Sequence, residues 1–381
     1  MELIEATSDF KINGISHPGF PLLLHDTMES CRPANEFMRW YLRRGAIGSE
    51  RSWPSTGRAL YDYFSFLEAH ELSWSDEWDE GDSSLLSDYR DYCLDTIRLS
   101  PNTVGQRLVY IAAFYEYGLR KGWIKSLPYD YEDRIVRKDG DFLQHVDASG
   151  GKASVRDVSP RKVKDLIRFL DRDQARMLVQ AASNPHHRMI IRFGLQTGLR
   201  RDEIASFPAE YVTRAARAGG TSHYVAVALD PRDGTCMRTK GGKKRVVHIS
   251  RSLIRDLNRY VKQVRGERAH VVDAGHGQLF LNQRGMPFAS HGKGLERIVR
   301  EIGERTGLDV HPHMLRHTYA THTLYDRQRR RKAGIDPLVF VQKQLGHQSI
   351  QTTMLYLHLV NELADDAVLE YDDELNEGWS A

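Results

Sequence analysis

The chain has 381 residues, with 54 Lys and Arg against 51 Asp and Glu, and a formal net charge of +3 at pH 7. A hydrophobic share of 40% and a charged share of 28% are typical of a globular protein and exclude a disordered one. No apolar run reaches the roughly 18 residues that a membrane-spanning helix needs, and the acidic N-terminus lacks the apolar stretch of a signal peptide. The length indicates two domains.

The charge is distributed unevenly along the chain. Residues 1–160 carry 18 basic and 26 acidic side chains, residues 161–360 carry 36 and 17, and residues 361–381 carry none and 8. A total near neutrality disfavours a nucleic-acid ligand, because phosphates are contacted mainly by cations. The basic middle region, with a net charge of +19, removes that objection.

The cysteines indicate a reducing compartment. Cys31, Cys93 and Cys236 are odd in number, far apart and form no CxxC pair. A disulfide scaffold and a structural zinc site are therefore disfavoured, and the expected location is the cytoplasm.

The first half of the chain is predicted to be helical after a loosely structured lead-in at 10–24. Apolar side chains recur at helical spacing between residues 34 and 124, with a start at Ser100-Pro101, a stop at Gly122 and an acidic loop at 74–87. We interpret these apolar residues as an ordinary helical core: Phe37, Trp40, Tyr41, Leu60, Phe64, Leu67, Ile111, Phe114 and Tyr115. Residues 138–160 lose periodicity and collect Gly and Ser where the charge changes sign, which is typical of a linker.

The second half mixes helices with a small sheet. Asp171 and Gln174 predict a capping box, and a following helix is expected to run from Pro185 to Gly198. A strand is predicted at 224–229, and residues 235–239 are expected to pair with 245–249 across a Gly-Gly turn. Mostly helical sequence follows, so the second half is predicted to be α+β, not alternating βαβ.

Two cationic stretches could carry chemistry. Arg200 follows the helix stop at Gly198, where its guanidinium can point inward with Glu203 near enough to help hold it. Lys240 lies at the Gly-Gly turn, and a flexible cationic turn can follow a DNA groove and present an ammonium to a phosphate. The candidate DNA contacts, read from charge, are Lys243, Lys244, Arg245 and Arg201.

Two further stretches contain histidines. A helix beginning near Pro312 would place His313 and Arg316 on one face, three residues apart. His347 follows Leu345-Gly346, and Tyr356 comes nine residues later.

Together these stretches resemble the tyrosine recombinase (phage integrase) family. The family pattern consists of five motifs: T-G-L-R-x-x-E-hydrophobic, G/T-K-G-x-K-x-R, H-x-L-R-H-T, L-G-H and a later Tyr. They occur here in that order, at residues 197–204, 239–245, 313–318, 345–347 and 356. The resemblance covers residues 170–358 and matches the first half only diffusely. It implies six catalytic residues: Arg200, Lys240, His313, Arg316, His347 and Tyr356.

The chemistry that this resemblance implies explains the residue types. Two guanidiniums can hold the non-bridging oxygens of a phosphodiester, where charge builds up in the transition state. Tyr356 would attack the phosphorus to form a 3′-phosphotyrosyl bond, and Lys240 would protonate the departing 5′-hydroxyl. Since the bond energy is kept, neither ATP nor a metal cofactor is required.

Each residue taken alone also has an ordinary interpretation. An Arg at a helix junction is usually on the surface or in a salt bridge, and a Tyr among leucines usually fills a core. His311, His313 and His317 could form a metal cluster, but no HExxH glutamate or nearby Cys supports one. The joint occurrence of all six residues favours the catalytic interpretation.

Three segments depart from the family pattern or remain open. The basic stretch 325–335 could contact phosphates or form a solvated helix face. The first half is more acidic than a DNA-contacting domain is expected to be. The acidic tail after Tyr356 has helical apolar spacing and could dock on a neighbouring protomer or fold back onto its own basic domain.

The expected architecture is an all-α N-terminal core-binding domain followed by an α+β catalytic domain. The expected boundaries are a lead-in at 1–29, a helical DNA-binding domain at 30–137, a linker at 138–164, a catalytic domain at 165–358 and a tail at 359–381. The partners that the resemblance implies are double-stranded DNA and further copies of the chain, four in the synapse. The sequence leaves open the DNA site and the need for accessory proteins. It also leaves open whether the enzyme integrates, excises or transposes a mobile element or resolves chromosomes. The rival functions are a type IB topoisomerase-like nicking enzyme and a DNA-binding regulator without catalysis.

Overall fold

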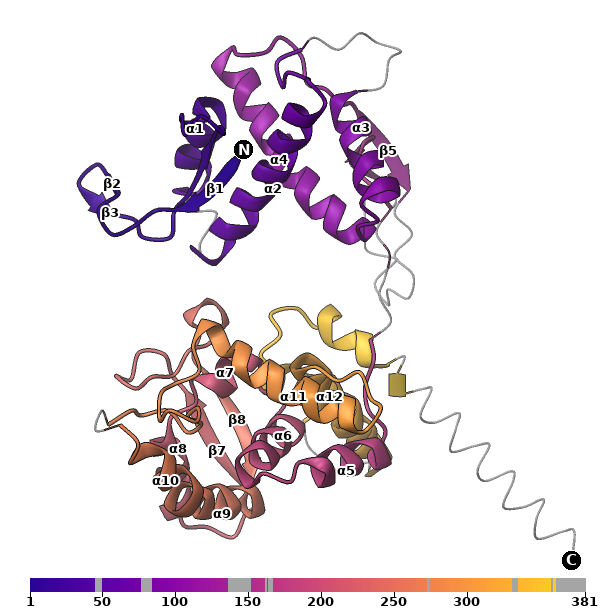
Figure 1. Cartoon of the computed structure of the whole chain (residues 1–381). Helices are drawn as coiled ribbons and strands as arrows, with labels where there is room; N and C mark the ends of the chain where they lie inside the picture. Colours follow the sequence, from indigo (N-terminus) through magenta and orange to yellow (C-terminus); the bar gives the residue numbers. More distant parts are fainter. Residues whose placement is uncertain are drawn as a thin grey trace, which may run out of the picture. The chain divides into compact units, whose positions relative to one another are not determined.

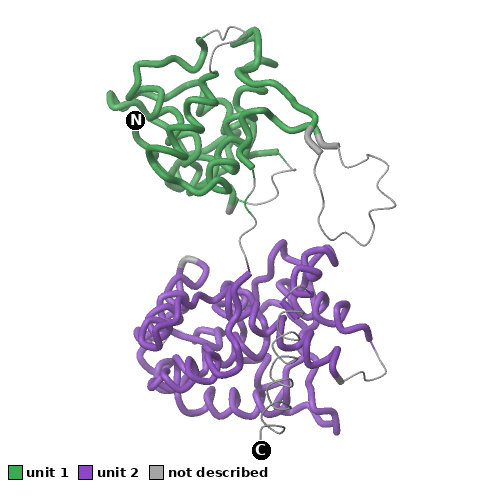
Figure 2. Tube along the Cα trace, turned by 90° about the vertical axis from the view of Figure 1, so that its right-hand side faces the viewer, with its two compact units in different colours: residues 1–165 green, residues 166–381 purple. Residues whose placement is uncertain are grey.

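The computed structural model describes residues 1–44, 50–76, 84–135, 152–161, 163, 167–272, 275–330, 335–357 and 359–360. The chain divides into two compact units, Met1–Asp165 and Leu166–Ala381 (Figure 2). The predicted tail after residue 360 and most of the predicted linker lie outside the described residues. No helix in the described ranges is both long and apolar enough to cross a membrane.

The first unit is built on helices joined by an aromatic core. Its α-helices are α1 (Arg32–Tyr41), α2 (Trp53–Ala69), α3 (Leu85–Asp91) and α4 (Pro101–Lys121). Ser100 caps α4 by accepting from the backbone of Thr103, and Gly122 ends it at a φ of 71°, which confirms the predicted start and stop. The predicted core residues are buried apart from Trp40 and Tyr41, which pack against the core partly exposed.

The N-terminal segment differs from the predicted loose lead-in. Strand β1 (Glu2–Glu5) pairs antiparallel with β4 (Pro21–Leu24), and β2 (Lys11–Ile12) pairs with β3 (Ile15–Ser16). The side-chain amide of Asn35 accepts from the Leu23 backbone N–H at 2.8 Å and donates to its carbonyl at 2.7 Å. The segment is therefore fixed to α1, and its short strands lack the alternation by which a strand is recognised in sequence.

Two other predictions in this unit need correction. Strand β5 (Tyr131–Ile135) pairs with β6 (Lys152–Arg156), so the predicted linker contains a strand of the first unit. The predicted acidic loop ends earlier than expected, because Ser84 caps α3 by accepting from the backbone of Ser87. Residues 77–83 of that loop are not among those described.

The second unit surrounds a two-stranded sheet with helices, as Figure 1 shows. Its α-helices are α5 (Arg172–Ala181), α6 (Pro185–Thr197), α7 (Arg201–Ala205), α8 (Ala209–Arg217), α9 (Arg251–Tyr260), α10 (Gly266–Ala269), α11 (Lys293–Arg305), α12 (Pro312–Arg330) and α13 (Pro337–Leu345). The predicted capping box of α5, the start and stop of α6 and the start of α12 are confirmed. The predicted α+β fold class, mostly helical with a small antiparallel sheet, is confirmed as well.

The sheet has a different strand pairing from the predicted one. Strand β7 (Tyr224–Leu229) pairs with β8 (Arg245–Ser250), and residues 235–239 form no strand. That segment is held on Ser206 at the end of α7, whose hydroxyl accepts from the Arg238 backbone N–H at 3.0 Å. The Gly-Gly turn is present at Lys240–Gly242, with both glycines at positive φ.

Two packing relationships position the later motifs. Helix α12 packs along α6, and α13 packs on β8. The side-chain amide of Gln344 bridges to the sheet, since it accepts from the His248 backbone N–H at 2.8 Å and donates to the His248 carbonyl at 3.1 Å. This places the end of α13 beside the α6–α7 junction.

Candidate active site

The α6–α7 junction projects Arg200 into the second unit. Gly198 ends α6 at a φ of 65°, in a conformation that glycine adopts at little cost. The backbone N–H of Arg200 donates to Glu203 at 2.8 Å, and its guanidinium donates to the other carboxylate oxygen at 3.3 Å. The sequence prediction that Glu203 helps to hold Arg200 therefore agrees with the geometry.

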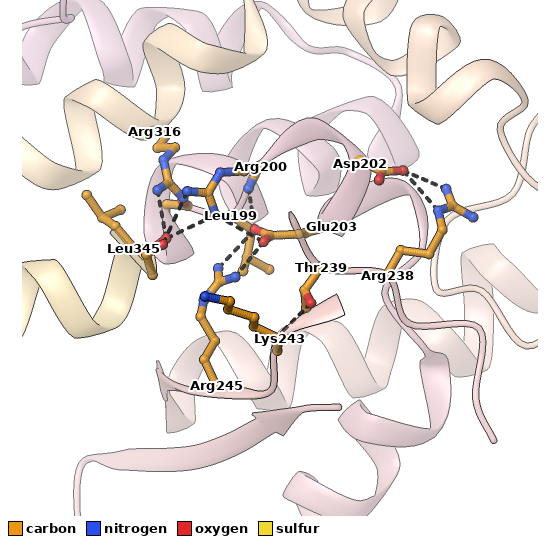
Figure 3. Close-up of polar contacts among 12 residues, drawn as sticks. Leu199, Arg200, Asp202, Glu203, Arg238, Thr239, Lys243, Arg245, Arg316 and Leu345 are labelled. Carbon is orange, nitrogen blue, oxygen red and sulfur yellow. Dashed lines mark hydrogen bonds and ion pairs between the residues drawn. The ribbon is translucent and has the colours of Figure 1, made fainter. Parts of the chain in front are cut away.

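Glu203 is buried, with only 1% of its side chain exposed. Its carboxylate also accepts hydrogen bonds from the guanidinium of Arg245, with which it forms an ion pair. Burial raises the pKa of Glu203, but the hydrogen bonds and charge of Arg245 and the contacts of Arg200 outweigh this effect and lower it overall. Arg245, a predicted DNA contact, instead directs its guanidinium into the protein (Figure 3).

Arg316 lies on the first turns of α12 and is 1% exposed. Its guanidinium donates to the carbonyl oxygens of Gly198 and Leu345, both at 2.7 Å, while Arg200 donates to the same Leu345 carbonyl at 3.2 Å. Figure 3 shows the two guanidiniums converging on this oxygen. Nε of Arg316 is buried and has no acceptor among the described residues.

The positive charges of Arg200 and Arg316 are not balanced by the nearby negative charge. Burial and then the charge of Arg200 lower the pKa of Arg316 to about 9. Glu203, which partly offsets this, is already shared by Arg200 and Arg245. A site with more buried positive than negative charge favours an anion, and a guanidinium pair suits the oxygens of a phosphate.

His313, His347 and His317 lie beside these arginines. His347 follows Gly346, and its Nδ1 lies 2.9 Å from the hydroxyl of Thr353. His313 is exposed, and its ring meets the His317 ring edge-on at 4.4 Å. Desolvation and then nearby cations, chiefly Arg316 for His313 and His347, lower the pKa to about 4 for His313 and about 3 for His347. Both rings are therefore neutral at pH 7 and offer one donor and one acceptor each.

Tyr356 belongs to a helical segment after α13 and is 2% exposed. Its ring lies in an apolar cluster with Leu345 and Leu324, and it stacks on His347 at 6.2 Å between centroids. Its hydroxyl lies 2.9 Å from Nδ1 of His317. Burial raises the pKa of Tyr356, and the charges of Arg316 and Arg200 offset part of that rise.

Lys240 is exposed on the Gly-Gly turn and faces a pocket of about 420 Å³. Arg200, His347, Lys243 and Lys244 line the same pocket. The structure therefore brings all six predicted catalytic residues into one region of the second unit.

The other predicted DNA contacts differ in their partners. Lys243 is exposed, and Lys244 is exposed but forms an ion pair with Asp230 at 2.9 Å. Arg201 forms an ion pair with Glu296 across to α11. In the basic stretch 325–335, the guanidinium of Arg327 lies 3.5 Å from the Phe340 ring centroid, and residues 331–334 are outside the described range.

Two features of the site escaped the sequence analysis. His317 belongs to the H-x-L-R-H-T motif, but the sequence assigns it no catalytic role, although its spacing of one helical turn from His313 places both on the same face. Gly346 has a φ of 67°, and a Cβ there would lie 2.7 Å from Cδ of Arg245. Among the described residues, no group of three or more His, Cys, Asp or Glu side chains could hold a metal ion.

Comparison with known proteins identifies the family. The model of the phage integrase family matches residues 168–362, which contain every motif described above. The chain belongs to the phage integrase family. It is accordingly a tyrosine site-specific recombinase, an enzyme that breaks and rejoins DNA strands.

Relatives are similar over most of this recombinase. Tyrosine recombinase XerA of Pyrococcus horikoshii is 25% identical over 75% of this chain and 93% of its own length. Tyrosine recombinase XerC of Roseiflexus castenholzii is 26% identical over 86% and 90%. Transposase A from transposon Tn554 of Staphylococcus aureus is 28% identical over 68% and 67%.

Solved structures share the fold. The Tn1549 transposon integrase in complex with transposon right end DNA gives a TM-score of 0.55 at 16% identity, over 86% of this chain and 93% of that one. The XerH recombinase bound to a difH substrate gives 0.55 at 17% identity, over 84% and 80%.

Proposed function

We propose that the hydroxyl oxygen of Tyr356 attacks a DNA phosphodiester held by Arg200 and Arg316. An O–P bond to the tyrosine forms, the bond from phosphorus to the 5′-oxygen breaks, and Lys240 gives that oxygen a proton. The product is a 3′-phosphotyrosyl bond and a free 5′-hydroxyl. Attack by the 5′-hydroxyl of another strand reverses the step and completes strand exchange.

One observation carries the proposal: Arg200 and Arg316 converge on the Leu345 carbonyl at the end of α13, the helix that precedes Tyr356. This contact supports the proposal, because the segment of chain that both guanidiniums contact leads on to Tyr356. Electrostatic stabilisation of developing charge is usually the largest catalytic contribution. His347 adds a neutral donor in the pocket lined by Arg200 and Lys240, and the charges of Arg316 and Arg200 act on His313.

The proposed partners are double-stranded DNA and other copies of the chain. Structures with this fold include XerH on difH, the Tn1549 integrase on transposon DNA and a lambda integrase dimer on a core site. Exposed Lys243 and Lys244 are proposed as phosphate contacts, and a synapse of four protomers as the active assembly. Similarity to a transposase and a transposon integrase supports mobility of an element as the biological role. Recombination assays would measure the preferred direction of recombination and the requirement for accessory proteins.

A suicide substrate tests the nucleophile. The duplex carries a nick a few bases beyond the scissile phosphate, so that the short 5′-hydroxyl fragment diffuses away, and its flanks are randomised to let the enzyme select a site. Wild-type protein should accumulate a covalent protein–DNA adduct, and Tyr356→Phe should not. Tyr224→Phe, at an exposed tyrosine of β7, is the matched control. An undiminished adduct with Tyr356→Phe refutes the assignment.

A further inference from the structure

The hydroxyl of Tyr356 is buried and has a defined partner. Among the described residues it makes one hydrogen bond, to Nδ1 of His317 at 2.9 Å. His317 lies on α12, immediately after Arg316, and its own side chain is only partly exposed. The two groups come from helical segments that pack together in one apolar cluster with Tyr319 and Leu345.

The direction of this hydrogen bond follows from the surroundings. Burial, followed by the charges of His313 and Arg316 and then of His311 and His347, lowers the pKa of His317 to about 3, so the ring is neutral at pH 7. If Nδ1 carried the ring proton, the buried phenol proton would have no acceptor in the described part of the chain. The arrangement that satisfies both groups has Tyr356 donating and Nδ1 accepting, with the proton of His317 on Nε2.

We propose that His317 accepts the proton of Tyr356 as its oxygen attacks the phosphorus, and that before attack it fixes the direction of the hydroxyl. The inference rests on the proposed function of Tyr356. In this step the phenol O–H bond breaks, Nδ1–H and O–P bonds form, and the P–O5′ bond breaks as Lys240 protonates the leaving oxygen. During religation the imidazolium of His317 returns the proton to the tyrosine.

The low basicity of His317 without DNA is consistent with this role. The neighbours that lower its pKa most are His313, Arg316, His311 and His347, which are positive or neutral groups. A bound phosphodiester brings negative charge next to Arg316, and further charge develops on the phosphoryl oxygens during attack. Both changes favour a protonated His317 at the moment when the phenol loses its proton.

The other two histidines are less suited to this step. Nδ1 of His347 is engaged by the Thr353 hydroxyl, and the His347 ring lies parallel to Tyr356, with an interplanar angle of 6°. His313 is exposed at the start of α12 and contacts His317, with no hydrogen bond to Tyr356. The geometry leaves them free for the phosphate oxygens.

The variant His317→Asn separates proton acceptance from positioning. The amide oxygen of Asn can occupy the place of Nδ1 and accept the hydrogen bond, but it cannot take the proton. In single-turnover cleavage of the suicide duplex, we expect the rate to fall by about 10²- to 10⁴-fold. DNA affinity should stay within a few-fold of wild type. The residual rate should rise by about tenfold per pH unit, because ionisation of the phenol must then supply the nucleophile.

A substrate with sulfur in place of the bridging 5′-oxygen provides the decisive comparison. A thiolate departs without a proton, so this substrate should restore cleavage by Lys240→Ala but not by His317→Asn. His223→Asn, at an exposed histidine, should behave as wild type on both substrates. His317→Ala with added imidazole gives a second readout, in which recovery of the rate is expected.

The outcomes distinguish this inference from the proposed function. A wild-type rate in His317→Asn, or its full rescue by the sulfur substrate, overturns proton acceptance by His317 while leaving Tyr356 as the nucleophile. Absence of any adduct with wild-type protein, or its persistence in Tyr356→Phe, overturns the proposed function itself.

Discussion

Arg200 and Arg316 donate to one acceptor, the carbonyl oxygen of Leu345, at 3.2 and 2.7 Å. The first arginine follows α6, the second lies on α12, and the acceptor is the last residue of α13. Helix α6 must therefore dock on α12 and α13, which are distant from it in sequence, before the two guanidiniums are placed side by side. Positive charges that are forced together in this way are a means of binding an anion.

Removal of either guanidinium should separate cleavage from DNA binding. For Arg200→Ala and for Arg316→Ala we expect cleavage to fall by at least about 10²- to 10³-fold, because each removes donors aimed at developing charge. DNA affinity should change only a few-fold, because the basic region 161–360 offers many other cations that can contact phosphates. Single-turnover cleavage and fluorescence anisotropy measure the two effects. Arg297→Ala, at an exposed arginine of α11, is the control; a variant with full turnover and weakened binding would contradict the assigned role.

The buried carboxylate of Glu203 should matter for stability. Glu203→Ala leaves the guanidinium of Arg245 buried without its partner, and we expect the free energy of unfolding to fall by about 3–5 kcal/mol. Glu296→Ala breaks the half-exposed pairs with Arg201 and Arg300 and should cost no more than about 1 kcal/mol. Urea unfolding at pH 7 compares them. Equal losses in the two variants would show that burial of Glu203 is not decisive.

Gly198 should tolerate no side chain. A Cβ there would overlap the Tyr319 ring and lie 2.9 Å from Cδ2 of Leu345, in addition to the cost of its positive φ. Gly307 has a similar φ of 72° but open space around its Cα. We expect Gly307→Ala to cost about 1–2 kcal/mol and Gly198→Ala clearly more. Thermal or urea unfolding measures both, and similar values would exclude the steric contribution.

Acid should destabilise the second unit through His186. This side chain is fully buried, with Nδ1 2.7 Å from the Tyr260 hydroxyl, and burial lowers its pKa to about 3. Because the folded-state pKa is below the unfolded value of about 6.5, the contribution is complete above pH 6.5 and is lost as pH falls toward 3. The loss approaches about 1.4 kcal/mol per pH unit.

The matched variant for this effect is His186→Gln, which cannot titrate in this range. Its free energy of unfolding should fall less steeply than that of wild type between pH 7 and pH 5. Urea unfolding at several pH values provides the comparison. Parallel curves for the two proteins would rule out His186 as a source of the acid sensitivity.

Local signals in the sequence predicted local structure well. The caps at Asp171 and Ser100 and the stops at Gly122 and Gly198 depend on neighbouring residues alone, and all are present. The six candidate catalytic residues came from motif resemblance, and the structure brings them together. Their roles stay predictions until they are tested.

The errors concern partners that are distant in sequence. Strand β8 pairs with β7 instead of the nearer residues 235–239, because that segment is tied to Ser206 on α7. Arg245 pairs with Glu203, a partner that its charge alone did not predict. His317 meets the hydroxyl of Tyr356 only when the segment carrying Tyr356 packs against α12. None of these choices is encoded within a short window of residues.

The close approach of Gly346 to the side-chain stem of Arg245 has an evolutionary consequence. Any side chain at position 346 would collide with Cδ of Arg245, so the two positions are expected to co-vary among relatives. Where a shorter residue replaces Arg245, the collision disappears but the left-handed backbone remains. Asn, which tolerates that conformation, is then the expected replacement for Gly346.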